Sequence, residues 1–102
     1  MDRVAHFTHL VAQQPGNDLF RFSLAQALIG SGRPSEAEPH LRQCVLAKAD
    51  WMIPRIALGK LLIERGRGQE AKPVLEEALR LAIEQSHEDP ETEVRGLLAE
   101  LK

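Results

Sequence analysis

The sequence contains few aromatic residues and a single cysteine. Phenylalanine and tryptophan together make up 4% of the 102 residues and tyrosine is absent, so the core is expected to be aliphatic. Cys44 cannot form an internal disulfide, which is compatible with a reducing compartment. At this length, with 43% hydrophobic residues, we expect one domain with a single core.

The sequence also lacks a strong charge of either sign and any long apolar run. Thirteen Lys and Arg residues stand against fifteen Asp and Glu, a formal charge of −2 that supplies no basic field for a phosphate backbone. Residues 1–16 hold no apolar stretch of signal-peptide length, and no later segment approaches the roughly 18 apolar residues typical of a membrane span. We therefore expect a cytoplasmic protein that binds neither nucleic acid nor membrane.

What the sequence does contain is an internal repeat. Residues 17–50 align without a gap on residues 51–84, a period of 34, with ten identical pairs at positions important for packing or turning. Each unit divides at its glycine, Gly32 or Gly66, and the halves on either side carry apolar residues three and four positions apart. The repeating unit is therefore predicted to be a helical hairpin closed by a glycine turn.

Pro39 and Pro73 occupy the same repeat position, inside the predicted second helices. An interior proline costs a helix about 3 kcal/mol, against about 5–15 kcal/mol for the stability of a whole domain. The spacing of Ser35 and Glu38 predicts a capping box that would place Pro39 near the fourth helical residue. Pro73 lacks such a cap, because Gln69 stands where Ser35 does. We expect both helices to begin within a few residues of the proline, or to bend there.

The period, the paired helices and their contact residues resemble the tetratricopeptide repeat, whose signature runs W-x2-L-G-x2-Y, then A-x3-F, then P. The second unit supplies Leu58 and Gly59, then Leu62 at the Tyr position, then Ala71 and Leu75. The small residues let neighbouring helices approach closely, and Ala25, Ala37 and the pair of Cys44 with Ala78 extend that pattern. The departures from the signature are Arg21 and Arg55 at the Trp position, and Trp51 four residues early.

The resemblance extends to both ends of the repeated region. Phe7, Leu10 and Pro15 fall at the second-helix positions of an incomplete leading unit, although Leu10 is bulkier than usual. The tail does not continue the period, but Pro90 starts a predicted capping helix with one apolar stripe: Val94, Leu97, Leu98 and Leu101. The resemblance implies an all-α, right-handed superhelix of about six helices in a single domain, 1–102. Its predicted parts are a leading helix 1–14, repeats 17–50 and 51–84, and a capping helix 90–102.

The first helix of each predicted unit has two apolar stripes. A helix that is apolar on two sides has to be covered on two sides. One stripe, which includes Leu24 and Leu28, is accounted for by packing within the repeat. The resemblance assigns the other to a concave groove where the family holds a peptide or a partner helix. The predicted partner-binding residues are Leu19, Phe22, Gln26 and Ile29 in the first unit and Ile53, Ile56, Lys60 and Ile63 in the second.

The sequence leaves open what covers this second stripe. The main hypothesis is an adaptor or scaffold whose groove binds an amphipathic helix or extended apolar peptide of another protein. The alternative is structural self-assembly as a homodimer or larger homo-oligomer, through the open leading half-unit or the C-terminal helix. The chain's own terminal helices would also suffice to cover the stripe.

Two further classes of partner are disfavoured. The family's clamp for C-terminal carboxylates needs Lys and Asn, and Phe22, Gln26 and Ala57 stand where several would be. RNA binding by helical hairpins is a third hypothesis, which the net charge and the period of 34 both oppose.

No catalytic residue, metal site or cofactor is predicted, so the chain is not expected to be an enzyme. His6 and His9 share a helical face but have no Cys, Asp or Glu beside them at metal-ligand spacing, which favours solvated surface histidines. His40 and His87 have no evident partner, and Cys44 is expected to be a buried inert thiol. The stretches "GSGRP" and "RGRGQ" are turn signals, because no strand precedes either as in a phosphate loop.

Overall fold

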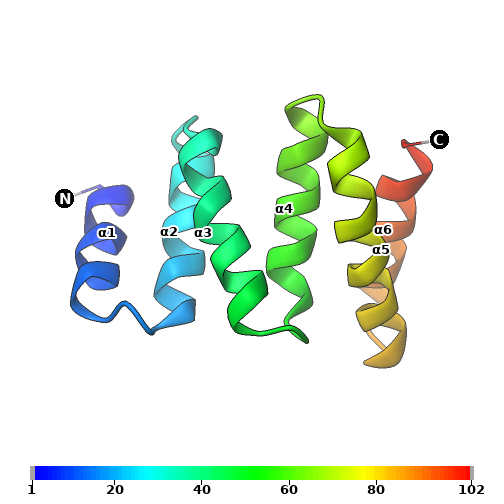
Figure 1. Cartoon of the computed structure of the whole chain (residues 1–102), viewed down its shortest axis with the longest axis horizontal. Helices are drawn as coiled ribbons and strands as arrows, with labels where there is room; N and C mark the ends of the chain where they lie inside the picture. The colour runs from blue at the N-terminus through cyan, green and yellow to red at the C-terminus, as the bar shows by residue number, and fades with distance from the viewer. Residues whose placement is uncertain (1, 102) are drawn as a thin grey trace. The chain divides into compact units, whose positions relative to one another are not determined.

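The computed structural model describes residues 2–101, and over these residues it contains six α-helices and no strand (Figure 1). The chain divides into two compact units, which we call unit 1 (Met1–Lys48) and unit 2 (Ala49–Lys102). The division falls within two residues of the boundary predicted between the repeats. Each unit is a set of three consecutive helices.

Unit 1 consists of α1 (Arg3–Gln13), α2 (Asp18–Gly30) and α3 (Pro34–Ala47). The three helices run alternately up and down, and α2 packs against both of the others (Figure 1). Asp2 and Asn17 cap the first two helices, because each side chain accepts a hydrogen bond from the backbone N–H three residues further on, at 2.9 and 3.1 Å.

Unit 2 consists of α4 (Met52–Glu64), α5 (Gly68–Glu84) and α6 (Glu88–Ala99). Here α5 is the helix that packs against both neighbours. The tail stripe predicted from the sequence lies on α6, where Val94 is fully buried and Leu97, Leu98 and Leu101 are half-buried. The α5–α6 hairpin therefore adds one more helix to the second repeat.

The glycine turns that divide each repeat are present where the sequence predicts them. Gly32 and Gly66 have φ of 75° and 74°, a left-handed conformation that costs glycine little because it has no Cβ. In both turns the N–H of the following arginine donates to a carbonyl of the last helical turn, at 2.9 and 2.8 Å. This is the Schellman arrangement, and it ends α2 and α4 at equivalent residues.

The second helices begin earlier than the sequence suggested. The N-cap of α3 is Arg33 rather than Ser35, so the predicted capping box is wrong and Pro39 lies at the sixth helical residue. Arg33 instead forms a bidentate pair with Glu36, at 2.7 and 2.8 Å, across the first turn of the helix. The hydrogen bond from Arg33 lowers the pKa of the Glu36 carboxyl, so this acidic group stays ionised near the helix N-terminus, where negative charge is favourable.

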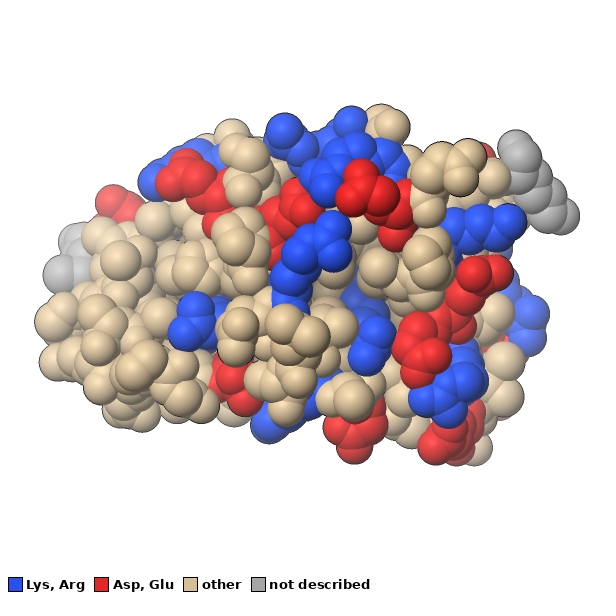
Figure 2. Space-filling view, in the orientation of Figure 1, with Lys and Arg blue, Asp and Glu red and all other residues tan. Residues whose placement is uncertain are grey.

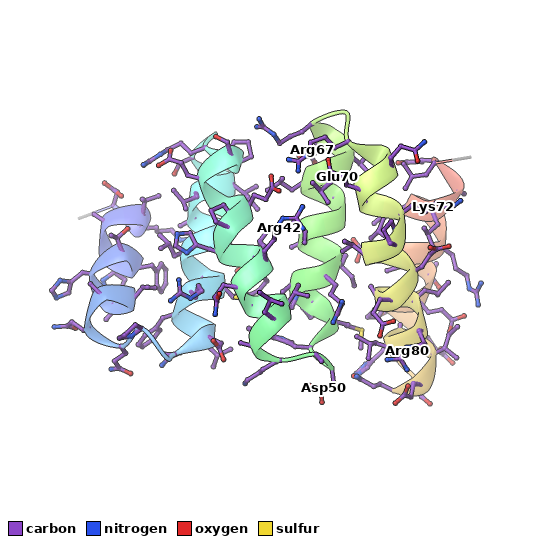
Figure 3. All side chains as sticks on the ribbon, in the orientation of Figure 1. Arg42, Asp50, Arg67, Glu70, Lys72 and Arg80 are labelled. Atoms are coloured by element: carbon purple, nitrogen blue, oxygen red, sulfur yellow. The ribbon has the colours of Figure 1, made fainter. Side chains whose placement is uncertain are left out.

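The second repeat starts α5 in the same way. Arg67 pairs with Glu70 at 2.7 and 2.8 Å, and Figure 3 shows the two side chains together at the start of the helix. Pro73 is consequently also the sixth residue of its helix. The repeated Arg-x-x-Glu sequence, rather than a Ser or Gln cap, marks where both second helices begin.

Aliphatic and small side chains fill the interior, as the composition predicts. Buried small residues recur at equivalent positions of the two hairpins. A Cβ added to Gly59 would lie 2.3 Å from Cδ2 of Leu75, so α4 and α5 are in direct contact there. The recurring small residues are Ala25 and Gly59, Ala37 and Ala71, and Cys44 and Ala78.

Candidate functional site

In unit 1, the predicted partner-binding residues lie along α2 with graded exposure. Leu19, in the first turn, is 63% exposed despite being a large hydrophobic residue. Phe22 and Ile29 are half-buried, and Gln26 is exposed between them. The α2 stripe is therefore an apolar surface, accessible mainly at its N-terminal end and interrupted by one amide.

In unit 2, the same positions lie along α4, but one of them differs from the prediction. Ile53 is 43% exposed and Ile63 is half-buried, whereas Ile56 is only 5% exposed and belongs to the core. Lys60 is exposed and forms an ion pair with Glu93 of α6. Helical spacing placed Ile56 on the outer stripe, but it could not show how far the neighbouring helices close over that stripe.

Leu19 and Ile53 stand 34 residues apart, so both repeats expose a large aliphatic side chain at the same position. The other large hydrophobic residues exposed among residues 2–101 are Leu46 and Ile83, and they do not correspond in the repeat. The terminal helices thus leave both Leu19 and Ile53 accessible to solvent. Among residues 2–101, Leu19 and Ile53 are the large hydrophobic residues that are exposed at equivalent positions of the two repeats.

Arginine replaces tryptophan at the family position in both repeats, and the structure shows what it does. Nη2 of Arg21 donates to the carbonyl of Pro15, and Nη2 of Arg55 donates to the carbonyl of Ala49, both at 3.0 Å. Each arginine thereby ties the loop before its helix to that helix. The sequence carried a signal for this role, since the two arginines are identical in the repeat and their acceptors are also equivalent.

His40 and Cys44 lie on α3 facing α2. Burial raises the pKa of the Cys44 thiol to about 11, an effect that the Asp18 carboxylate increases. The thiol donates a long hydrogen bond of 3.8 Å to the carbonyl of Asp18. The expected burial of Cys44 is confirmed, and a thiol with a raised pKa holds little thiolate near neutral pH.

His40 has a partner that the sequence did not reveal, since its Nδ1 lies 3.3 Å from Nη1 of Arg21. Burial lowers the pKa of the His40 imidazole, and the charge of Arg21 lowers it further. The folded state therefore favours the neutral ring more strongly than the unfolded chain does. The part of the free energy of unfolding that depends on a neutral His40 is fully present above the unfolded histidine pKa of about 6.5. It is lost as the pH falls below that value.

The His40→Val variant tests this linkage, because valine is the residue at the equivalent position, Val74. We expect wild type to lose more stability than His40→Val when the pH is lowered through the histidine range. Urea denaturation at several pH values measures the difference. Identical pH profiles for the two proteins would contradict the assignment.

Metal-ligand groups and membrane-spanning helices were both sought among the described residues. No group of three or more His, Cys, Asp or Glu side chains within residues 2–101 is arranged to hold a metal ion. His6 and His9 are exposed, and the His6 ring packs edge-on against Phe7 with centroids 5.1 Å apart. None of the helices described here has the length and apolar character needed to cross a bilayer.

Repeated helical hairpins of this period define a class of repeat protein, and comparison with known families identifies which one. The tetratricopeptide repeat model matches residues 19–43 and 52–77, which begin in α2 and α4 and run into α3 and α5. The chain belongs to the tetratricopeptide repeat family, so the resemblance and the all-α helical-hairpin fold class are confirmed. Comparison with curated proteins and with solved structures gives no match. Repeats of this family generally mediate protein–protein interaction and are not catalytic.

Proposed function

We propose that this chain is a protein-interaction module in which each first helix, α2 in unit 1 and α4 in unit 2, binds a segment of another protein through its own exposed stripe. The observation that supports the proposal most directly is the equivalent exposure of Leu19 and Ile53. Moving a large aliphatic side chain out of water lowers the free energy of the system. Because both repeats expose such a side chain at the same position, each repeat offers a partner the same kind of apolar contact.

The stripes also indicate the chemistry of the segment. Each combines an apolar N-terminal end with a polar residue near mid-helix, Gln26 in α2 and Lys60 in α4. An amphipathic helix or an extended peptide with alternating apolar residues matches this arrangement. Both partners of the Lys60–Glu93 ion pair are nearly half exposed, so a carboxylate on the bound segment can replace Glu93 at low cost.

A displayed library of helical and extended peptides tests the proposal without a known partner. We expect wild type to enrich peptides with apolar residues at helical or alternating spacing, and Leu19→Glu and Ile53→Glu to bind them less well. Each substitution removes an aliphatic contact of about 1.5–3 kcal/mol, which corresponds to a loss of affinity of roughly tenfold to a hundredfold. Isothermal titration with the enriched peptides measures the loss.

Leu46→Glu is the matched control, because it makes the same change at an exposed leucine of α3 that is not repeated in unit 2. The control is expected to bind the selected peptides like wild type. Unchanged affinity in both stripe variants, or an equal loss in the control, would rule out the stripes as the binding surface.

A further inference from the structure

The first helices of the two repeats begin differently. At the N-cap of α2, the Asn17 side chain accepts a hydrogen bond from the N–H of Phe20, whereas Trp51, at the equivalent position before α4, makes no capping hydrogen bond. A capping side chain stabilises a helix, so Trp51 gives up a local contribution to stability that Asn17 makes. A residue that breaks a local rule in one repeat indicates a use outside the helix itself.

Trp51 lines a surface pocket at the N-terminal end of α4. The pocket has a volume of about 200 Å³, and Met52, Ile53 and Pro90 extend its apolar lining. Ile53 is the exposed stripe residue of α4, so the pocket opens at that stripe. Pockets that hold a whole small molecule measure about 300–1,000 Å³, so this one has room for a single side chain. The polar residues of its lining are Asp50, Gln85 and His87.

Hydrogen bonds within unit 2 hold the walls of this pocket together. Nε2 of Gln85 donates to the carbonyl of Asp50 at 2.9 Å and so joins the end of α5 to the loop before α4. At the end of α5, Ser86 has φ of 59° and the N–H of His87 donates to the carbonyl of Ala82 at 2.9 Å, another Schellman turn. A pocket whose walls are already ordered costs less to occupy than one that has to form on binding.

The charges around the pocket favour a cation. Asp50 is exposed in the lining, and Glu88 and Asp89 are exposed at the start of α6, next to the lining residue Pro90. The starts of α4 and α6 lie at the same, lower end of unit 2 (Figure 1), and their two dipoles are together equivalent to about one positive charge. The three carboxylates exceed this by about two charges, and Lys48, two residues before Asp50, offsets at most one of them. Figure 2 shows acidic side chains at this lower end.

The arginines of this part of unit 2 are already paired. Arg80 donates to Glu77 at 2.9 Å and to Glu84 at 2.5 Å. Arg55 donates to the carbonyl of Ala49. The hydrogen bond from Arg80 lowers the pKa of the Glu77 carboxyl, and the charge of Arg55 lowers it further. These two arginines and two glutamates carry no net charge together, so the carboxylate in the pocket lining remains available to a cation from a partner.

We propose that this pocket binds an arginine side chain of the segment held by the α4 stripe, an inference that rests on the proposed function. The methylene stem of the arginine lies against Ile53 and Pro90, and its guanidinium pairs with the carboxylate of Asp50. Figure 3 shows Asp50 at the lower end of α4. Lys60 lies seven residues beyond Ile53, about 10 Å along α4. The bound segment therefore has its arginine about 10 Å from the carboxylate that pairs with Lys60.

Three short peptides test the pocket directly: acetyl-leucyl-arginine amide and the versions with citrulline or norleucine in place of the arginine. Citrulline keeps the length and the planar end without the charge, and norleucine keeps only the apolar stem. Trp51 is the only tryptophan in the chain, so its fluorescence reports binding at the pocket. We expect weak binding, with the arginine peptide about fivefold tighter than the other two. Equal affinity of the arginine peptide and either of the others would overturn the proposal.

Two triple variants show whether the carboxylates at the pocket are the cause. The pocket variant combines Asp50→Asn, Glu88→Gln and Asp89→Asn, and its preference for arginine over citrulline should disappear. The control variant removes the same charge from exposed positions of unit 2 that do not line the pocket, and its preference should remain. Circular dichroism shows whether both variants keep their helices. A preference that is lost in both variants, or kept in both, would contradict the assignment. The control substitutions are Glu64→Gln, Glu76→Gln and Glu100→Gln.

Peptides enriched from the displayed library separate this inference from the proposed function. We expect peptides that bind the α4 stripe to contain an arginine, and to lose about fivefold in affinity when citrulline replaces it. Enriched peptides that depend on Ile53 but not on an arginine would overturn the pocket assignment and leave the proposed function in place. Stripe variants that bind the enriched peptides like wild type would contradict the proposed function, and the three short peptides would still decide the preference of the pocket.

Discussion

Replacing Pro73 by alanine should raise the free energy of unfolding by about 2 kcal/mol. Pro73 is the sixth residue of α5, so it cannot donate the usual intrahelical hydrogen bond to the carbonyl of Gln69, and an interior proline ring crowds the carbonyl four residues earlier. An interior proline costs about 3 kcal/mol, and its restriction of the unfolded chain returns only about 0.4–1 kcal/mol. The side chain is exposed, so alanine gives up no buried surface. Chemical denaturation of the full chain measures the gain, and Pro39→Ala in α3 should behave alike.

Pro34→Ala is the matched control for these substitutions. Pro34 is the first residue of α3, a position where the missing N–H has no intrahelical acceptor and the fixed φ suits a helix start. We expect alanine there to leave stability nearly unchanged or slightly reduced. If Pro73→Ala and Pro39→Ala also left stability unchanged, the interior position of the two prolines would be contradicted.

Replacing Gly59 by leucine should cost about 3 kcal/mol or more and is expected to unfold much of unit 2. A Cβ at this position would lie 2.3 and 2.5 Å from Cδ2 and Cγ of Leu75, which is itself fully buried. Overpacking a core by even one or two methylenes costs about 1–3 kcal/mol, and leucine adds four carbon atoms. The gain in helix propensity over glycine, about 1 kcal/mol, is too small to compensate.

Three further variants show whether the Leu75 contact is the cause. Gly96 lies on an exposed part of α6 with no atom within 4 Å of an added Cβ, so Gly96→Leu should raise stability through helix propensity alone. Leu75→Ala in the Gly59→Leu background should recover part of the loss, although Leu75→Ala alone destabilises. Thermal and urea unfolding of wild type, Gly59→Leu, Leu75→Ala and the double variant give the coupling energy between positions 59 and 75. Additive effects of the two substitutions would show that the residues do not interact.

Much of the fold could be predicted from the sequence because the repeat places strong local signals at a fixed spacing. Gly32 and Gly66 end helices through a backbone conformation that glycine adopts readily, so the turn positions follow from the residues themselves. The aliphatic spacing of three and four likewise identifies helices without any knowledge of their neighbours. The helix starts were harder to place, because a serine three residues before a glutamate is a common pattern and Arg33 with Glu36 competes with it.

The candidate site was predicted less well than the fold. The sequence predicts that Ile53 and Ile56 lie on the same outer stripe of α4, yet Ile53 is exposed and Ile56 is buried. Both belong to one predicted stripe, and only the closeness of the surrounding helices separates them. The loop contacts of Arg21 and Arg55 also escaped prediction, because the carbonyl groups they reach lie six residues earlier, across a helix start.

By itself the sequence determined that this chain is a helical-hairpin repeat, where its hairpins turn, and that its first helices have more apolar surface than one contact can cover. Those properties depend on residues a few positions apart along one chain segment. The tertiary structure alone decided which apolar side chains remain in water, Leu19 and Ile53, and which residues at the starts of α4 and α6 line one pocket. Burial depends on how closely helices distant in sequence approach one another, and side-chain spacing does not record that distance.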